Sequence, residues 1–209
     1  MNFEFTKPSH DTKKITDFSA DIDILHTALG YADSKENALD IGAHIGIISR
    51  ELSKNFKSVF SFEPLWSDYT KKNTEDLNNV KIHSIGLGEH NTVEEIYIMK
   101  NNTGGSSILT HPRRTWQKNA QKQLIEIKPL DYYNFTNVGL IKIDVESYEL
   151  PVLRGAKNTL QKNSPVILVE LMTKYEDSKY PVKDTISFLN SLGYIEIKKV
   201  GDNRIFKKD

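Results

Sequence analysis

The 209-residue sequence predicts an α/β protein built on a mostly parallel, doubly wound sheet. Short runs of strand-forming residues alternate with helix-spaced apolar residues, which is the pattern of repeated strand and helix units. The first strand breaks into a glycine turn that opens a helix. The last two strand-like runs are separated by Gly201-Asp202-Asn203, a turn sequence that favours an antiparallel C-terminal hairpin.

The first part of the chain supplies a leading helix and three strands. Ile22, Leu25 and Leu29 share one face of a helix expected over residues 17–29, within an N-terminal helical extension of about residues 1–36. The expected elements that follow are a strand at 38–40, a helix at 45–55, a strand at 59–62, a helix at 67–77 and a strand at 80–85.

Between about residues 89 and 138 the alternation stops, which predicts an insertion on the substrate side of the sheet. Two strand-like runs, 93–99 and 124–127, flank a polar loop over 100–123. Alternation then resumes with a strand at 140–145, a helix at 148–161, a strand at 166–170, a helix at 182–192 and strands at 194–199 and 204–207. The length and the absence of repeats favour a single domain over residues 1–209.

Composition narrows the classes of function. Basic and acidic residues number 28 each, so the chain lacks the positive field typical of nucleic-acid binding and a nucleic-acid partner is not expected. No cysteine is present, which excludes a disulfide framework and a cysteine nucleophile. The sequence shows neither a signal peptide nor a membrane span, and we expect a cytoplasmic protein without a membrane partner. Its oligomeric state stays open.

The glycine turn has the spacing Asp40-x-Gly42-x-x-x-Gly46, and such a turn aims backbone N–H groups at a ligand. His44 stands where the dinucleotide-binding motif has its second glycine. In that motif the glycine lets the pyrophosphate approach the backbone. The imidazole therefore disfavours NAD and favours a smaller ligand such as S-adenosylmethionine in a Rossmann-like site. An ordinary strand-to-helix turn is the alternative.

Acidic residues end four of the predicted parallel strands: Asp40, Glu63, Asp144 and Glu170. Ligands of open α/β sheets bind at this edge, although any one acid could instead cap a helix. Glu63 follows Asp40 by 23 residues, a spacing typical of the acid that binds ribose hydroxyls. Lys142 interrupts an apolar strand and shares a face with Asp144, either as a structural ion pair or as part of a charged catalytic cleft.

Several segments together resemble the FkbM-type methyltransferases. They are Leu39–Gly46, Phe62–Pro64, Ser106–Leu109, Ile141–Glu146, Glu149–Ala156 and Val166–Leu171. The resemblance implies a seven-stranded sheet, S-adenosylmethionine as cofactor, and cofactor contacts from Asp40, Gly42, Gly46 and Glu63, with Asp144 beside the transferred methyl group. His44, in the same turn, is also a cofactor-binding candidate. His44 replaces a residue that is often asparagine in the family, and Ser147 replaces one that is usually glycine.

Methyl transfer to a hydroxyl needs a base, and Asp144 is the first candidate. Lys142 and Glu170 are further catalytic candidates, and Glu146, His90 and His111 lie outside this first choice. No metal site is assigned, although a divalent ion held by acids such as Asp144 and Glu170 could activate a diol instead.

The long polar loop predicts a lid over the substrate, because loops of this length in compact domains are usually functional or disordered. Gly104 and Gly105 could act as hinges, while Arg113, Arg114 and Trp116 could bind an anionic or aromatic part of the substrate. The expected acceptor is a hydroxyl on a small molecule or carbohydrate. The alternatives are an N-methyltransferase acting on protein or RNA, a nucleotide-binding oxidoreductase and an inactive binding module.

Overall fold

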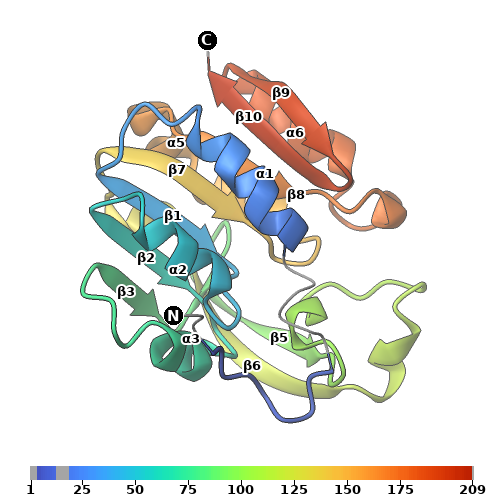
Figure 1. The fold of residues 1–209 in the computed structure, drawn as a ribbon. Helices are drawn as coiled ribbons and strands as arrows, with labels where there is room; N and C mark the ends of the chain where they lie inside the picture. The colour runs from blue at the N-terminus through green and yellow to red at the C-terminus, as the bar shows by residue number, and fades with distance from the viewer. Residues whose placement is uncertain (1–3, 13–18, 209) are drawn as a thin grey trace.

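The computed structural model describes residues 4–12 and 19–208. The larger of its two sheets (Figure 1) consists of β1 (Asn37–Ile41), β2 (Ser58–Phe62), β3 (Val80–His83), β7 (Val138–Ile143), β8 (Val166–Glu170), β9 (Tyr194–Val200) and β10 (Asn203–Lys208). The strand order is β3-β2-β1-β7-β8-β10-β9. Neighbours from β3 to β8 are parallel, whereas β10 is antiparallel to β8 and β9. The mostly parallel seven-stranded sheet with its C-terminal hairpin is confirmed.

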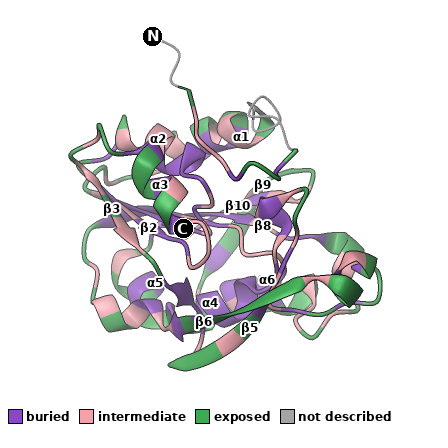
Figure 2. Cartoon of the chain, turned by 90° about the horizontal axis from the view of Figure 1, so that it is seen from below, coloured by how far each residue is buried: buried purple, intermediate pink, exposed green. Residues whose placement is uncertain are grey.

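Helices cover both faces of this sheet (Figure 2), because strand side chains alternate between its two sides. On one face α1 (Ser19–Leu29) and α2 (Ile47–Ser53) pack, with α3 (Ser67–Asn73) beside α2. On the other face lie α4 (Glu149–Arg154), α5 (Lys157–Asn163) and α6 (Val182–Ser191). Ala38 of β1 belongs to the first core, and its neighbour Leu39 belongs to the second.

Strand order reverses between β1 and β7, which are adjacent at the middle of the sheet. The chain passes from β1 outward to β2 and β3, and later returns to place β7 on the opposite side of β1. A crevice forms at such a point, outside the carboxyl ends of the strands. The register of this pair sets Asp40 directly beside Lys142.

The helix predicted over 148–161 is two helices, α4 and α5. Gly155 separates them, and its backbone is packed so closely that a Cβ there would lie 1.9 Å from the Gly88 carbonyl oxygen. The Asp131 carboxylate accepts the backbone N–H groups of Asn158 and Thr159 at 2.9 and 2.8 Å. This cap begins a new helix, and nothing in the local apolar spacing indicates it.

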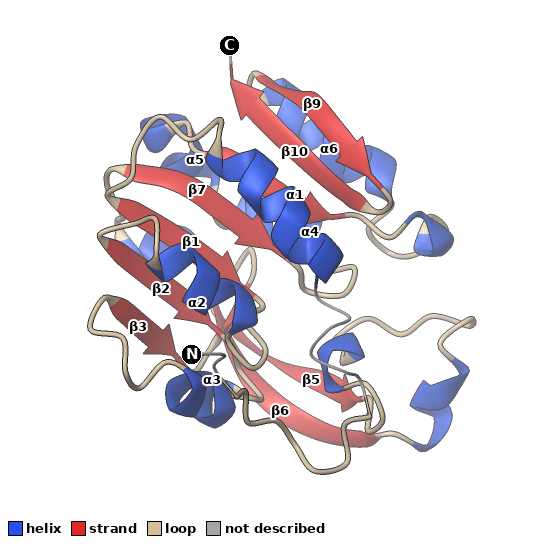
Figure 3. Cartoon of the chain, in the orientation of Figure 1, coloured by secondary structure: helices blue, strands red, loops and turns tan. Residues whose placement is uncertain are grey.

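The smaller sheet contains β4 (Gly86–Leu87), β5 (Thr92–Ile98) and β6 (Gln121–Lys128), in the order β4-β6-β5. Its two longer strands, β5 and β6, lie side by side in Figure 3. The strand predicted at 80–85 therefore ends at His83, and the chain leaves the large sheet before β4. Ile96, Ile125 and Ile127 are buried and face the large sheet's crevice as an apolar wall.

The segment between β5 and β6 is folded rather than a featureless loop. It contains the short 3-10 helices η2 (Thr103–Gly105) and η3 (Thr115–Asn119). Tyr97 and Ser107 exchange two backbone hydrogen bonds of 2.9 and 3.1 Å, and the Gln117 side chain donates to the Leu109 carbonyl at 2.8 Å. These contacts give a polar sequence a defined path.

The leading helix α1 begins at Ser19, and the first two positions of the predicted helix, 17 and 18, lie outside the described residues. Ile24, Leu25 and Ala28 bury one side of α1 against the sheet. None of the helices in the described ranges is long and apolar enough to cross a membrane.

Candidate active site

A cavity of about 310 Å³ opens at the carboxyl edge of β1, β2 and β7. Its walls include the glycine turn after β1, Glu63 and Trp66 after β2, and the acids after β7 and β8. The apolar residues of the smaller sheet close another side. Its volume is in the range of small-ligand sites, and its position is the crevice that the strand order predicts.

The glycine turn has three residues with left-handed backbone conformation: Gly42 (φ 78°), His44 (φ 50°) and Gly46 (φ 89°). The Gly42 and Ala43 N–H groups donate to the Phe62 carbonyl at 3.0 and 3.1 Å, which ties the turn to β2. A Cβ on Gly42 would lie 1.8 Å from the Asp144 carbonyl oxygen, so glycine is required there. Histidine adopts the left-handed region more readily than most residues other than glycine, which suits it to position 44.

The sequence names Gly42, His44 and Gly46 as cofactor-binding candidates, and the structure places them differently. Gly42 and His44 line the cavity, whereas Gly46 is not among its lining residues. The Gly46 N–H instead donates to the Ala43 carbonyl at 2.8 Å and closes the turn.

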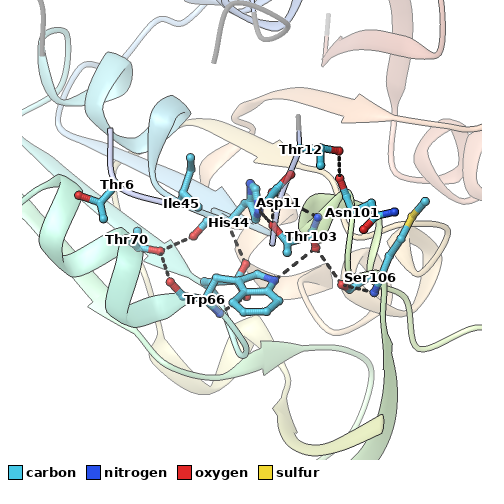
Figure 4. Close-up of polar contacts among 12 residues, drawn as sticks. Thr6, Asp11, Thr12, His44, Ile45, Trp66, Thr70, Asn101, Thr103 and Ser106 are labelled. Atoms are coloured by element: carbon cyan, nitrogen blue, oxygen red, sulfur yellow. Dashed lines mark hydrogen bonds and ion pairs between the residues drawn. The ribbon is translucent and has the colours of Figure 1, made fainter. Parts of the chain in front are cut away.

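The His44 side chain joins the glycine turn to two distant segments (Figure 4). Its Nε2 lies 2.7 Å from the Thr103 hydroxyl, and that hydroxyl donates to the buried Asp11 carboxylate. The Trp66 indole N–H donates to the Thr103 carbonyl at 3.2 Å. Sequence reasoning missed Asp11 and Thr103, since they lie 92 residues apart and belong to no motif.

Residues 4–12 lie along the outside of the glycine turn. The Asn73 amide group exchanges two hydrogen bonds of 2.7 Å with the Thr6 backbone and donates to the Ile45 carbonyl at 2.7 Å. The Thr12 N–H donates to the Asn101 carbonyl at 3.1 Å. The N-terminal segment thus connects α3, the glycine turn and η2.

Glu63 lines the cavity with a buried and well-bonded carboxylate. It accepts the backbone N–H groups of His44 at 2.8 Å, Leu65 at 2.8 Å and Trp66 at 3.0 Å. Burial raises the pKa of Glu63 above its ordinary value, and these three donors oppose that rise. A carboxylate has about four acceptor positions, so one remains for a ligand. The ribose role of Glu63 stays a prediction.

Asp40 is fully buried and is not among the residues that line the cavity. It accepts the Ser49 hydroxyl at 2.6 Å and lies 3.9 Å from the Lys142 ammonium. Burial raises the pKa of Asp40, and the Lys142 charge acts in the opposite direction. Its position is that of a support beneath Lys142 and does not offer the direct cofactor contact that the resemblance implies.

Lys142 lines the cavity, where it forms an ion pair with Asp144 and also belongs to a charged cleft. Its Nζ lies 3.4 Å from the Asp144 carboxylate and 3.4 Å from the Gly42 carbonyl. Burial lowers the pKa of Lys142, but the negative charges of Asp144 and Asp40, with further acids, outweigh burial and raise that pKa above its ordinary value. The side chain therefore stays an ammonium and cannot act as a general base.

Three acids converge on one side of the cavity, and we call them the acidic cluster: Asp144, Glu146 and Glu170. One carboxylate oxygen of each lies within 4.8 Å of the others. The Asp144 charge, together with burial and a hydrogen bond to Asp144, raises the pKa of Glu170 far above its ordinary value. The pair therefore holds a shared proton at neutral pH. Within the described ranges, these are also the side chains arranged so that they could hold a divalent ion.

The predicted substrate residues Arg113, Arg114 and Trp116 are not among the lining residues of the cavity. Arg113 is exposed and pairs with Asp177 at 3.6 Å, whereas Arg114 is 3% exposed and bonds the turn after β7. Their role in substrate binding stays a prediction without support from the cavity. The outside base candidates His90 and His111 do not line it either: His90 is exposed, and His111 lies 2.9 Å from Asp177.

Comparison with known proteins places these features in a family. The Methyltransferase FkbM domain model matches residues 40–196, which is most of the chain. A curated relative, Methyltransferase 1 of Beauveria bassiana (strain ARSEF 2860), is 23% identical in an alignment of 180 positions. That alignment covers 75% of this chain and 71% of that protein.

Solved structures share the fold at low identity. Methyltransferase FkbM from Methylobacillus flagellatus KT aligns with a TM-score of 0.53 and 19% sequence identity. The alignment covers 83% of this chain but only 43% of the length of that protein. A second structure is the N-methyltransferase NodS from Bradyrhizobium japonicum WM9 in complex with S-adenosyl-L-homocysteine. It aligns with a TM-score of 0.53 and 11% sequence identity, and the alignment covers 93% of this chain and 87% of the NodS chain. Together with the domain match over most of its length, the fold leads to one conclusion: this chain belongs to the FkbM family of methyltransferases.

Proposed function

We propose that this chain transfers the methyl group of S-adenosylmethionine to a hydroxyl of a small molecule or carbohydrate. The observation that carries the proposal is that a single cavity joins the glycine turn and Glu63 to the acidic cluster. A cofactor bound at one end would therefore present its reactive group to acids that can accept a proton at the other.

The residues of the cavity fit S-adenosylmethionine. Gly42 and His44 would lie at its amino-acid end, and the fourth acceptor position of Glu63 suits a ribose hydroxyl. The carboxylate oxygens of the acidic cluster suit a cationic sulfonium. The NodS structure, which contains S-adenosyl-L-homocysteine in the same fold, supports this assignment.

When bound, S-adenosylmethionine supplies an electrophilic methyl group on a positively charged sulfur. Asp144 is placed to accept the proton of the acceptor hydroxyl, because its side chain is 36% exposed and lines the cavity. Lys142 places a positive charge 3.4 Å from the Asp144 carboxylate, while the Asp144 charge and burial raise the pKa of Glu170. A positioned base of this kind contributes about 10²–10⁴-fold to a rate.

An amine acceptor is the second candidate, and the acidic cluster is the observation that favours it. The carboxylate oxygens of the cluster could accept hydrogen bonds from a protonated amine and then accept its proton. The neutral overall charge of the chain gives no comparable support to RNA.

Two measurements test the proposal. Calorimetry with S-adenosyl-L-homocysteine should show binding, and NAD in a parallel titration should not bind. A panel of sugars, phenols and primary amines is then screened for release of S-adenosyl-L-homocysteine by mass spectrometry. Turnover with hydroxyl acceptors is the expected result, and turnover confined to amines would replace the first candidate with the second. Absence of S-adenosyl-L-homocysteine binding by the folded protein would overturn the proposal.

A further inference from the structure

We propose that Arg114 is a positioning residue that holds the Glu146 carboxylate in the cavity and thereby completes the acidic cluster. The inference rests on the proposed function only in treating this side of the cavity as the acceptor side. It assigns to Arg114 a role different from the substrate contact that its sequence position predicts.

The Arg114 guanidinium bonds the turn that follows β7. Its Nη2 donates to the Glu146 carbonyl at 3.0 Å, to the Glu146 carboxylate at 3.3 Å and to the Ser147 hydroxyl at 3.1 Å. The Tyr175 ring lies under the guanidinium, 4.4 Å from Cζ. The side chain is almost wholly buried, so water screens these contacts little.

The turn that Arg114 holds is strained. Glu146 and Ser147 are consecutive residues with left-handed backbone, at φ 55° and 78°, and neither is glycine. Such conformations are unfavourable for residues other than glycine and persist only where surrounding contacts impose them. The Ser107 hydroxyl donates to the Glu146 carbonyl at 2.8 Å and Glu149 accepts the Ser147 N–H at 3.0 Å, and these contacts hold the backbone. The contact with Arg114 extends the restraint to the carboxylate.

Like charges act against this placement. The Glu146 carboxylate lies close to those of Asp144 and Glu170, and such carboxylates repel one another. Lys142 pairs with Asp144 at the inner side of the cluster, while Arg114 pairs with Glu146 at 3.3 Å on the other side. Without the guanidinium, the side chain of Glu146 would gain by turning toward water.

Burial of Arg114 is itself costly. Its Nη1 is buried without a hydrogen-bond partner, and such groups reduce stability. Ser147 supplies the hydroxyl to which Arg114 donates. Stability alone would favour glycine at φ 78° and an apolar residue at 114. The arrangement is explained by the position it gives to Glu146.

The test measures the pKa of Glu170 in the ligand-free protein, by an NMR titration of protein labelled with 13C at the glutamate carboxyl groups. The charge of Asp144, burial, a hydrogen bond to Asp144 and the charge of Glu146 raise the pKa of Glu170. The charge of Lys142 lowers it. If Arg114 positions Glu146, Arg114→Gln should lower the pKa of Glu170 by about one pH unit, because a neighbouring charge moves away. If Arg114 acted only through its own positive charge, that pKa would rise. An unchanged pKa would show that Arg114 merely packs, and either of these two results overturns the proposal.

A double-mutant cycle and two further variants complete the design. Glu146→Gln should lower the Glu170 pKa similarly, and adding Arg114→Gln to it should lower that pKa no further. Arg113→Gln, the exposed neighbour, is the matched control and should leave the titration unchanged. If Arg114→Gln does not fold, Ser147→Gly removes one Arg114 contact and should give a smaller fall, and an unchanged titration in that variant overturns the proposal. Calorimetry with S-adenosyl-L-homocysteine tests the proposed function separately, because the NMR experiment uses no ligand.

Discussion

The two ends of the cavity balance their charges in opposite ways. At the Glu63 end, one carboxylate is matched by three backbone N–H groups that the fold itself fixes in place. At the other end, the acidic cluster relies on two side-chain cations, Lys142 and Arg114. The first end is therefore held by backbone hydrogen bonds. The second keeps a shared proton at neutral pH, and pKa values displaced in this way are typical of sites that carry out chemistry.

The backbone shows the same contrast. In the turn after β1, glycines supply two of the three left-handed conformations, where they cost little, and His44 supplies the third. In the turn after β7 the same conformations fall on Glu146 and Ser147, and side chains from the insertion and from α4 impose them. Glycines thus provide most of the left-handed backbone at one end, whereas at the other end contacts from distant side chains impose it on non-glycine residues.

The largest expected effect is at the acidic end. Asp144→Asn should reduce turnover about 10²–10⁴-fold with whichever acceptor the screen identifies, because the base is lost. The affinity for S-adenosyl-L-homocysteine and the melting temperature should change little, since Asp144 belongs to the acceptor end. Steady-state kinetics, calorimetry and thermal unfolding measure the three quantities. Turnover at the wild-type rate would show that Asp144 is not the base, and the contrast between the two ends of the cavity would no longer hold.

A second effect concerns pH and stability. Burial raises the pKa of Glu149 to about 8, so its folded pKa lies above its unfolded one. Between these values the unfolded chain has lost a proton that the folded chain keeps. This contribution to stability is therefore complete below the unfolded pKa and is lost as pH rises to about 8, by at most about 1.4 kcal/mol per pH unit.

Glu149→Gln should remove that loss, because its amide oxygen can still accept the Ser147 N–H without ionising. Urea unfolding at several values between pH 5 and 8 should give a flatter profile for the variant. Glu75→Gln is the control, because Glu75 is exposed and lies just after the end of α3. Its stability should change with pH as that of the wild type does. Parallel profiles for Glu149→Gln and wild type would contradict the assignment.

At the Glu63 end, Glu63→Ala should weaken S-adenosyl-L-homocysteine binding at least about tenfold, which is about 1.4 kcal/mol. The variant loses a ribose acceptor and leaves three N–H groups without their carboxylate. Calorimetry measures the affinity, and Glu75→Ala serves as the exposed control. Equal affinities for Glu63→Ala and wild type would move the ribose site elsewhere.

The smallest effect is expected at His44. In His44→Asn the left-handed backbone is retained, since asparagine accepts it, but the contact with Thr103 is lost. One such hydrogen bond is worth about 1 kcal/mol. Urea unfolding should detect that loss, while S-adenosyl-L-homocysteine affinity should stay within about threefold, less than 1 kcal/mol. A larger loss of affinity would show that the imidazole itself binds the cofactor.

Sequence pattern predicted the architecture because its signals are local. Apolar runs, glycine turns and the Gly201-Asp202-Asn203 turn each act over a few residues, and the strand and helix order follows from them. The acids Asp40, Glu63, Asp144 and Glu170 were correctly placed at one edge, because parallel strands end together. The helix break at Gly155 was missed, because its cause, Asp131, lies in another segment.

By itself, then, the sequence determined the fold class, the family and the edge of the sheet where the site lies. Tertiary structure decided which of the acids reach the cavity: Asp40 is buried beneath Lys142, while Glu146 joins Asp144 and Glu170. It also turned Arg114 away from the cavity lining and joined His44 to Asp11 through Thr103. Periodicity reports the face on which a residue lies, but burial, pKa and pairing depend on charges and packing from segments far away in the chain.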